Sequence, residues 1–502
     1  MWWSISKASA RASWAGGQAL GDAMAQAASA RRLQRGARAV ARGAVGPWDP
    51  TPPPGAQGYL DFSGVARPQD ISCADWWFPL GRYVMPRHPW SADQPIGLPE
   101  REVNRHTVII GPTRAGKTAS IIAPWIVEGL SADHVVVALD IKGKQDLRNE
   151  IISYRDAAYP GARFRINEWN YSNPGGSRRW NFIRELSDDG AVNAATEGIC
   201  GLPRDNDPNR NFHLRDMKWA RGLLELAYDS GLDLGVRNLL DVLSAPDDLD
   251  RLVQRYANTR GAQRLRDLVA IDPGEQARAT QFLATYFEVL NNDGFVQVTR
   301  SSGFKLKEKV FEQGQLLLVD APTSDGPLAA VASGLFLSQV IHWRLSAFGS
   351  KPPPMLLVID EAPRVLDRVD LGRLLSLAAG ANVSVVIALQ DVKQLPDDRR
   401  DEILANCGTT ILMAGASPTS TEYVSKRLGT RIAASYSATE SHARGSGRST
   451  GYSLSSAPTP VMGDNELRTP PTGRFGAVVI NNNISPRPII VDLTRADLVG
   501  QP

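Results

Sequence analysis

The segment GPTRAGKT, from Gly111 to Thr118, constrains the fold of this chain more than any other part of its sequence. It satisfies the pattern GxxxxGK[ST], in which a glycine-rich loop joins a β-strand to a helix. The flanking residues fit that order, because the apolar run Thr107–Ile110 ends directly before the loop and a helical segment begins near Lys117. A fortuitous glycine-rich turn would not require this strand–loop–helix context. The segment therefore predicts a nucleotide-binding P-loop.

The residue types of this loop suit the chemistry of a bound triphosphate. Glycine lets the backbone approach phosphate oxygens where a Cβ atom would collide, and backbone N–H groups and a helix N-terminus face the anion. Lys117 would place its charge on the β- and γ-phosphates, and Thr118 would offer its hydroxyl to Mg²⁺. We expect ATP and Mg²⁺ as cofactors. The residues expected to hold the nucleotide are Gly111, Pro112, Thr113, Arg114, Ala115, Gly116, Lys117 and Thr118.

A second apolar run, MLLVIDE, ends in two adjacent carboxylates, Asp360 and Glu361. We expect Asp360 to hold Mg²⁺ together with Thr118, directly or through water, and Glu361 to orient or activate the attacking water. The alternative is a solvated strand end. Asp320 closes a run of the same shape, but Ala321 follows it, so that position lacks the second carboxylate. The pair at 360 and 361 is therefore the predicted Walker-B site.

Gln390 follows the apolar run Val383–Leu389. An amide at this strand end can sense the γ-phosphate and relay its loss, although an ordinary polar strand end is the alternative. The predicted catalytic residues are thus Glu361, Lys117 and Gln390. The sequence contains no NKxD motif of the kind that recognises guanine, so ATP is expected in preference to GTP.

Largely apolar runs alternate with helical patterns along the chain, which predicts an α/β fold. Such runs suit strands that are covered on both faces, as in a mainly parallel sheet flanked by helices. Polar residues at their carboxyl ends fit the rule that these sheets bind ligands there. The predicted strands cover residues 107–110, 135–139, 316–319, 355–359, 383–389 and 409–413.

Four parts are expected along the sequence. Residues 1–45 form a basic, alanine-rich segment, and residues 46–105 combine a proline-rich linker with short strands. Residues 186–290 contain no convincing strand and predict an all-helical insertion domain. Residues 106–185 and 291–497 then form one discontinuous nucleotide-binding domain. The helical patterns of the insertion cover residues 217–228, 236–243, 248–257 and 275–290.

Two features near the C-terminus complete this organisation. Residues 434–460 are rich in Ser, Gly, Thr and Ala, which predicts a flexible loop. Strands at 477–480 and 488–491 are expected to complete the edge of the sheet.

Composition sets only broad limits on the partners, the compartment and the membrane association of this chain. The formal net charge of +3 is too small to indicate a nucleic-acid partner by itself. The three cysteines, Cys73, Cys200 and Cys407, form no CxxC pair, which fits a reducing compartment. No apolar run is long enough to predict a transmembrane helix. The basic segment 1–45 fits either a helix on an anionic membrane surface or partner, or a disordered tail.

The order of these motifs resembles that of the type IV coupling proteins, the TraG/TraD group of conjugation and secretion ATPases. The resemblance runs from about residue 78 to residue 493. It is carried by HTVIIGPTRAGKTASIIAPWIV (106–127), VVVALDIKGK (135–144), SRRWNFI (177–183), LLVIDEAPRV (356–365), VSVVIALQDVKQL (383–395), ILANCGTTILMAG (403–415) and TSTEYVSKRLGT (419–430).

This resemblance implies a RecA-like motor domain with an all-helical insertion. It implies a homo-hexameric ring that binds nucleotide at its subunit interfaces. It also implies sequence-independent binding of single- or double-stranded DNA, and partners that include a relaxase or another secreted protein and the components of a type IV secretion channel. The expected location is the cytoplasm, peripheral to the inner face of the bacterial cell membrane.

Three departures from the family pattern bear on these expectations. The family usually begins with transmembrane helices, which the sequence does not predict here. Lys144 stands where a Glu is common, and Ala379 stands where relatives often place an arginine that serves a neighbouring subunit's nucleotide. An arginine of this kind contributes about three to five orders of magnitude in rate. The nearby arginines that could replace it are Arg364, Arg368 and Arg373.

The leading functional hypothesis is a DNA-translocating or substrate-delivering ATPase of a type IV secretion or conjugation system. Two alternatives stay open: an ATP-bound adaptor of low turnover that recruits a protein substrate, and a cytosolic DNA-processing motor unconnected with a channel. Candidate contacts to the DNA backbone, with ordinary solvated charges as the alternative, are Lys142, Lys144, Arg178 and Arg179.

Overall fold

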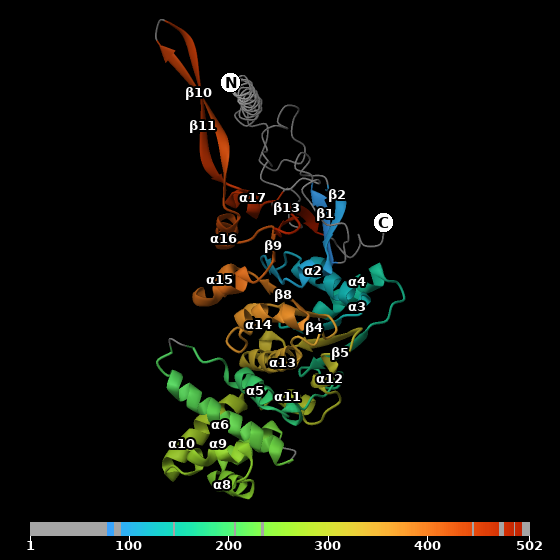
Figure 1. The fold of residues 1–502 in the computed structure, drawn as a ribbon, viewed down its shortest axis with the longest axis vertical. Helices are drawn as coiled ribbons and strands as arrows, with labels where there is room; N and C mark the ends of the chain where they lie inside the picture. The colour runs from blue at the N-terminus through green and yellow to red at the C-terminus, as the bar shows by residue number, and fades with distance from the viewer. Residues whose placement is uncertain are drawn as a thin grey trace, which may run out of the picture. The chain divides into compact units, whose positions relative to one another are not determined.

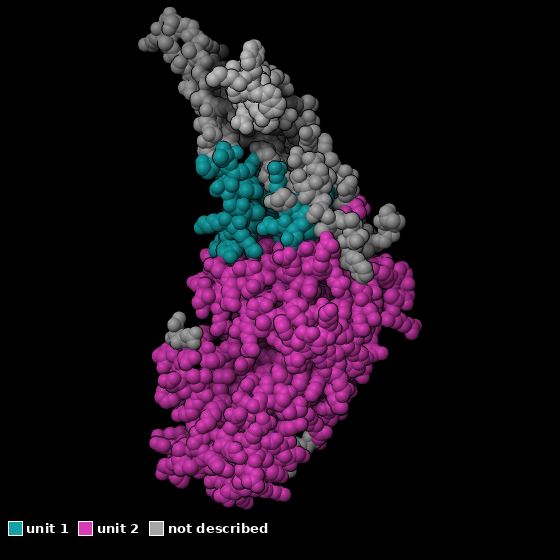
Figure 2. Space-filling model, in the orientation of Figure 1, with its two compact units in different colours: residues 1–72, 83–94, 414–492 teal, residues 73–82, 95–413, 493–502 magenta. Residues whose placement is uncertain are grey.

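The computed structural model describes residues 78–84, 92–143, 146–204, 207–231, 235–443, 446–470, 476–485 and 487–493. The basic segment 1–45, the proline-rich linker and Lys144 lie outside the described residues. The chain divides into two compact units (Figure 2). Unit 1 is built from residues 1–72, 83–94 and 414–492, and unit 2 from residues 73–82, 95–413 and 493–502.

A parallel sheet forms the centre of unit 2, with the strand order β9-β3-β8-β7-β4-β6-β5 (Figure 1). All of its strands except β5 are buried along their whole length, as expected for strands with helices on both faces. The six predicted strands are confirmed, and β5 was not predicted. The bounds are β3 (Thr107–Ile110), β4 (Val135–Asp140), β5 (Arg165–Asn170), β6 (Gln315–Asp320), β7 (Met355–Asp360), β8 (Val383–Leu389) and β9 (Thr409–Met413).

Helices follow most of these strands. The helix after β3 begins with a π-helical turn and continues as α3, in which Pro124 lies at the start, where its missing N–H is tolerated. The bounds are α2 (Glu100–Val103), η2 (Thr118–Ile122), α3 (Ala123–Ser131), α4 (Asp146–Ala158), η4 (Thr323–Asp325), α13 (Pro327–Ser346), η5 (Ala362–Arg364), α14 (Leu371–Leu377), η6 (Ala378–Ala381), η7 (Val392–Gln394) and α15 (Asp397–Ala405).

Between β5 and β6 the described residues form helices and no strand. The four predicted helical patterns each overlap a helix, because their apolar residues recur at helical spacing and become buried. The domain boundaries at 186 and 290 stay predictions. The bounds are η3 (Phe182–Glu185), α5 (Asp189–Cys200), α6 (Arg210–Asp229), α7 (Val236–Ser244), α8 (Pro246–Arg255), α9 (Arg260–Val269), α10 (Pro273–Glu288), α11 (Asp293–Thr299) and α12 (Leu306–Lys309).

An aromatic cluster joins the helical segment to the sheet. Trp169 of β5 lies 5.6 Å from Trp180, 5.8 Å from Phe295 of α11 and 5.5 Å from Phe336 of α13, measured between ring centroids. Large aromatic rings bury much apolar area and favour such edge-to-face and offset contacts. The cluster therefore fixes the direction in which the helices leave β5.

The helix α13 is long and apolar enough to cross a membrane by length and composition, and 78% of its apolar window is buried inside the protein. It packs against α5 closely, since a Cβ atom added to Gly198 would lie 2.5 Å from Cα of Leu335. Such burial is the property of a core helix in a folded domain.

Unit 1 contains two antiparallel hairpins. β12 (Gly476–Ile480) pairs with β13 (Ile489–Leu493), which confirms the two predicted C-terminal strands. β10 (Thr430–Ala443) pairs with β11 (Ser446–Pro460), so the prediction of a flexible loop at 434–460 is wrong. Backbone hydrogen bonds form this ladder, and they require no apolar stripe in the sequence. Unit 1 also holds α16 (Pro418–Leu428) and α17 (Asp464–Arg468).

Two further strands, β1 (Phe78–Val84) and β2 (Ala92–Leu98), are neighbours in their sheet. The boundary between the two units passes through both of them. They confirm that short strands precede the P-loop.

Candidate nucleotide site

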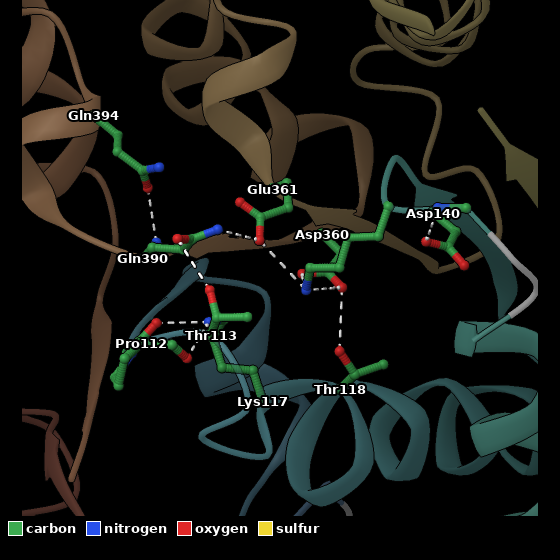
Figure 3. A network of polar contacts seen from close by, with 12 residues as sticks. Pro112, Thr113, Lys117, Thr118, Asp140, Asp360, Glu361, Gln390 and Gln394 are labelled. Atoms are coloured by element: carbon green, nitrogen blue, oxygen red, sulfur yellow. Dashed lines mark hydrogen bonds and ion pairs between the residues drawn. The ribbon is translucent and has the colours of Figure 1, made fainter. Parts of the chain in front are cut away.

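The predicted site residues meet at the carboxyl edge of the parallel sheet in unit 2. β3 leads into the P-loop, β7 ends at Asp360, and Gln390 directly follows β8. Because β8 lies between β3 and β7, these three strand ends are adjacent. Figure 3 shows the side chains of Lys117, Thr118 and Glu361 turned toward the same space.

Gly111 begins the P-loop where the backbone has no room for a side chain. Its N–H donates to the Leu389 carbonyl at 3.1 Å, which extends the β3–β8 ladder by one residue. A Cβ atom at this position would lie 2.8 Å from Cβ of Met413. Further along, Gly116 takes a φ of 94° and Arg114 a φ of 64°, so the loop turns twice through left-handed backbone.

The Lys117 side chain folds back over this loop. Its Nζ donates to the carbonyl oxygens of Gly111 at 2.6 Å and Pro112 at 3.1 Å, and the residue is only 4% exposed. Burial, followed by repulsion from Lys142, lowers the pKa of the Lys117 ammonium. These contacts hold the amine on the concave side of the loop, where a phosphate would compete for it.

Thr118 and Asp360 form a donor set that fits Mg²⁺. The Thr118 hydroxyl donates to Oδ2 of Asp360 at 3.2 Å, and Asp360 is 1% exposed. A hydroxyl beside a carboxylate is the kind of oxygen donor set that Mg²⁺ prefers. The structure thus brings the two predicted metal ligands together, although they are 242 residues apart.

Glu361 is held by Gln390 at the side of the P-loop. Gln390 donates from Nε2 to Oε1 of Glu361 at 2.9 Å and accepts at Oε1 from the Thr113 hydroxyl at 3.2 Å. In Figure 3 its amide lies between these two partners. Glu361 has a φ of 65°, a left-handed conformation that is strained for a residue with a side chain.

The remaining P-loop residues differ in exposure. Thr113 and Arg114 are exposed, Pro112 and Gly116 are half-buried, and Ala115 is buried. The side chains of Thr113 and Arg114 are thus exposed, whereas that of Lys117 is buried against the loop.

Lys142 and Asp140 belong to the site although neither was predicted as part of it. Lys142 donates to both oxygens of Asp360, at 3.2 Å and 3.0 Å, and lies 3.4 Å from Oε1 of Glu361. Asp140 is in register with Asp360, and burial raises its pKa to about 6. The sequence signal for both was the run VVVALDIKGK, which ends a strand as the Walker-B run does. As a DNA contact Lys142 remains a hypothesis.

Three arginines could take over the role of the arginine that relatives often have at the position of Ala379, and they lie in different environments. Arg368 donates to the carbonyls of Gly198 at 3.1 Å and Ile199 at 2.6 Å, at the end of α5. Arg364 and Arg373 are exposed. The contacts of Arg368 give it a structural role, so Arg364 and Arg373 are the ones available to another molecule. Arg178 and Arg179 are also exposed.

Two family descriptions match this sequence. Residues 81–209 match the family described as "Type IV secretory system Conjugative DNA transfer", and residues 354–472 match the one described as "TraM recognition site of TraD and TraG". The first match contains the P-loop and the second contains the Walker-B pair and Gln390. No curated protein sequence matches this chain.

Several solved structures of the bacterial conjugative coupling protein TrwB are similar in fold. TrwBdeltaN70 in complex with sulphate has a TM-score of 0.59 and 17% identity, over 86% of this chain and 100% of that chain. TrwB with ADP and Mg²⁺ has a TM-score of 0.58 and 17% identity, over 87% and 100%. TrwB with the ATP analogue ADPNP has a TM-score of 0.59 and 17% identity, over 86% and 98%. The chain therefore has the RecA-like P-loop fold.

Proposed function

The chain belongs to the type IV coupling protein family, and from this premise we propose that it is an ATP-hydrolysing motor. Its work is to deliver or translocate DNA, or a protein attached to DNA, to a type IV secretion or conjugation channel. One observation carries the ATPase part of the proposal: Lys117, Thr118, Asp360, Glu361 and Gln390 come together at one edge of the sheet. There Thr118 donates to Asp360 at 3.2 Å and Gln390 donates to Glu361 at 2.9 Å.

ATP and Mg²⁺ are the proposed cofactors, and the TrwB complexes with ADP and Mg²⁺ and with ADPNP support them. Mg²⁺ bound between Thr118 and Asp360 would neutralise charge that develops on the β- and γ-phosphates. Lys117, which now donates to two backbone carbonyls, would donate to phosphate oxygens of the bound nucleotide, and the backbone N–H groups at the start of η2 would stabilise the same anion.

Glu361 is the proposed residue that orients and activates the attacking water. Its side chain is 7% exposed, and its carboxylate contacts both Gln390 and Lys142. Because Gln390 also contacts Thr113 of the P-loop, it can report the presence of the γ-phosphate to Glu361. Gln390 is therefore a positioning residue.

The partners follow from the family. The matched descriptions name conjugative DNA transfer and TraM recognition, which support DNA and a protein of the transfer machinery as partners. We propose a homo-hexamer that binds DNA without regard to sequence and engages a relaxase or another secreted protein. Its proposed location is the cytoplasmic face of the bacterial cell membrane, at the channel.

The test is steady-state ATP hydrolysis by the purified chain, with and without single- and double-stranded DNA, beside Glu361→Gln. A DNA motor shows stimulation by DNA that disappears in the variant, and its DNA affinity falls steeply with salt because phosphate contacts release counterions. Slow ATP hydrolysis that DNA does not stimulate would refute the hypothesis of a DNA motor.

An adaptor that binds ATP and turns it over slowly is the second candidate, and Ala379 favours it. Arg364→Ala and Arg373→Ala decide between the two. If either variant loses about three orders of magnitude in turnover, an arginine finger operates from that position. If both variants keep the wild-type rate and that rate is low, the adaptor is favoured. A cytosolic DNA motor unconnected with a channel would be stimulated by DNA but would bind no channel component.

A further inference from the structure

Lys142 contacts both Walker-B carboxylates but has no role of its own in the proposed mechanism. It is the second residue after β4, and its ammonium reaches across to the end of the neighbouring strand β7. There it donates to Oδ1 of Asp360 at 3.2 Å and to Oδ2 at 3.0 Å, and it lies 3.4 Å from Glu361. One cation thus bridges both Walker-B carboxylates.

The geometry makes Lys142 the counter-ion of these carboxylates. The side chains of Asp360 and Glu361 are 1% and 7% exposed, whereas that of Lys142 is 33% exposed. Lys117, the other cation of the site, donates instead to carbonyls of its own loop. Buried carboxylates need a hydrogen-bonding or oppositely charged partner. Here that partner is Lys142, which is itself partly exposed to solvent.

The same oxygens are those that a metal ion would use. Oδ2 of Asp360 accepts both from Lys142 and from Thr118, the other predicted metal ligand. An ammonium and a divalent cation repel each other when both contact one carboxylate oxygen, so each weakens the binding of the other there. The partial exposure of Lys142 gives its flexible stem a route away from Asp360.

We propose that Lys142 competes with Mg²⁺ for Asp360, so that loading of the metal–nucleotide requires Lys142 to withdraw. Lys142 holds the two carboxylates in place until the metal displaces it, and it sets the Mg²⁺ concentration at which the site fills. The inference rests on the proposed function, because it concerns the nucleotide site of that ATPase.

The experiment measures the Mg²⁺ dependence of ADP binding by titration calorimetry, without any turnover. Lys142→Gln is compared with Lys142→Arg, which keeps the charge, and with Lys351→Gln, which removes an exposed lysine that precedes β7 at the opposite end of the strand. We expect Lys142→Gln to lower the Mg²⁺ concentration for half-maximal binding about tenfold. Lys142→Arg and Lys351→Gln should stay within about twofold of wild type.

A second readout uses the metal alone. Thermal unfolding without nucleotide is followed as Mg²⁺ is added. Lys142→Gln should have a lower Tm than wild type in the absence of Mg²⁺, because its carboxylates lack their counter-ion, and a larger rise of Tm when Mg²⁺ is present. Lys351→Gln should show neither change. This measurement applies even if the variant is destabilised, because the rise of Tm is compared within one protein.

Two results would overturn the proposal. An unchanged Mg²⁺ requirement in Lys142→Gln would show that no competition exists. A higher requirement would show that Lys142 assists the metal–nucleotide. Failure of the proposed function looks different: wild-type protein would then bind no ADP at any Mg²⁺ concentration, and Lys117→Ala would behave like wild type.

Discussion

Replacement of Gln390 by alanine tests whether this amide positions the catalytic carboxylate. The change removes the hydrogen bond from Nε2 to Glu361, 2.9 Å long, and the contact with Thr113, 3.2 Å long. Glu361 keeps its ion pair with Lys142 at 3.4 Å but loses the hydrogen bond that supports it on the other side. The expected defect is therefore in orientation.

The magnitude follows from the bond that is lost. A hydrogen bond to a charged group contributes about 1.5–3 kcal/mol. If the hydrogen bond stabilises only the transition state, in which Glu361 orients the attacking water, its loss lowers kcat by roughly one to two orders of magnitude. This loss is at or below the lower limit of the range of about 10²–10⁴ that a whole general base contributes. The contact with Thr113 is exposed, so nucleotide affinity should change by less than about threefold.

The assay is single-turnover hydrolysis of ATP, with the nucleotide Kd measured separately. Gln394→Ala is the control, because Gln394 accepts from the backbone N–H of Gln390 at 2.8 Å and leaves the bridging amide in place. We expect a lower kcat at nearly constant Kd for Gln390→Ala, and near wild-type kcat for Gln394→Ala. A raised Kd with unchanged kcat would refute the reasoning, since Gln390 would then bind nucleotide and not position Glu361.

Three further outcomes are expected. Burial lowers the pKa of His106 to about 4, from 6.5, and its Nδ1 accepts from the Val385 N–H at 3.2 Å. The neutral ring stabilises the fold fully above pH 6.5, and this stability is lost as pH falls toward 4, by up to about 1.4 kcal/mol per pH unit. Urea unfolding of His106→Asn across this range should show a shallower decline than wild type, and equal slopes would contradict the assignment. Arg368→Met leaves two carbonyls of α5 without their donor, so Tm should fall while turnover per folded molecule stays unchanged; lost turnover at normal Tm would indicate a catalytic role. Gly111→Ala places a Cβ atom 2.8 Å from that of Met413 and should lower the free energy of unfolding by about 1–3 kcal/mol. Normal stability in urea would refute that packing argument.

The parallel sheet could be predicted from the sequence because its strands are buried on both faces. The run Val383–Leu389 is apolar at every position except Ser384, and its bounds agree with the observed strand. The strand β5 was missed because its sequence, RINEWN, places polar residues beside apolar ones at the edge of the sheet. The hairpin β10–β11 was missed because its ladder depends on backbone pairing between Ser- and Gly-rich segments.

The sequence by itself also determined the chemistry of the nucleotide site. The pattern of the P-loop and the adjacent carboxylates at 360 and 361 depend on spacing along the chain, since a loop and a strand end are local structures. Gly111, Lys117 and Thr118 are close in sequence, so the conformation of one loop brings them together and no long-range contact is needed.

Which distant residues complete that site depends on how the strands are ordered in the folded domain. Lys142 reaches Asp360, and Gln390 bridges Glu361 and Thr113, because β4, β7, β8 and β3 end side by side. Strand order is set by the packing of helices and strands across the whole domain, which no local pattern records. The same packing turned Arg368 toward the end of α5 and left Arg364 exposed.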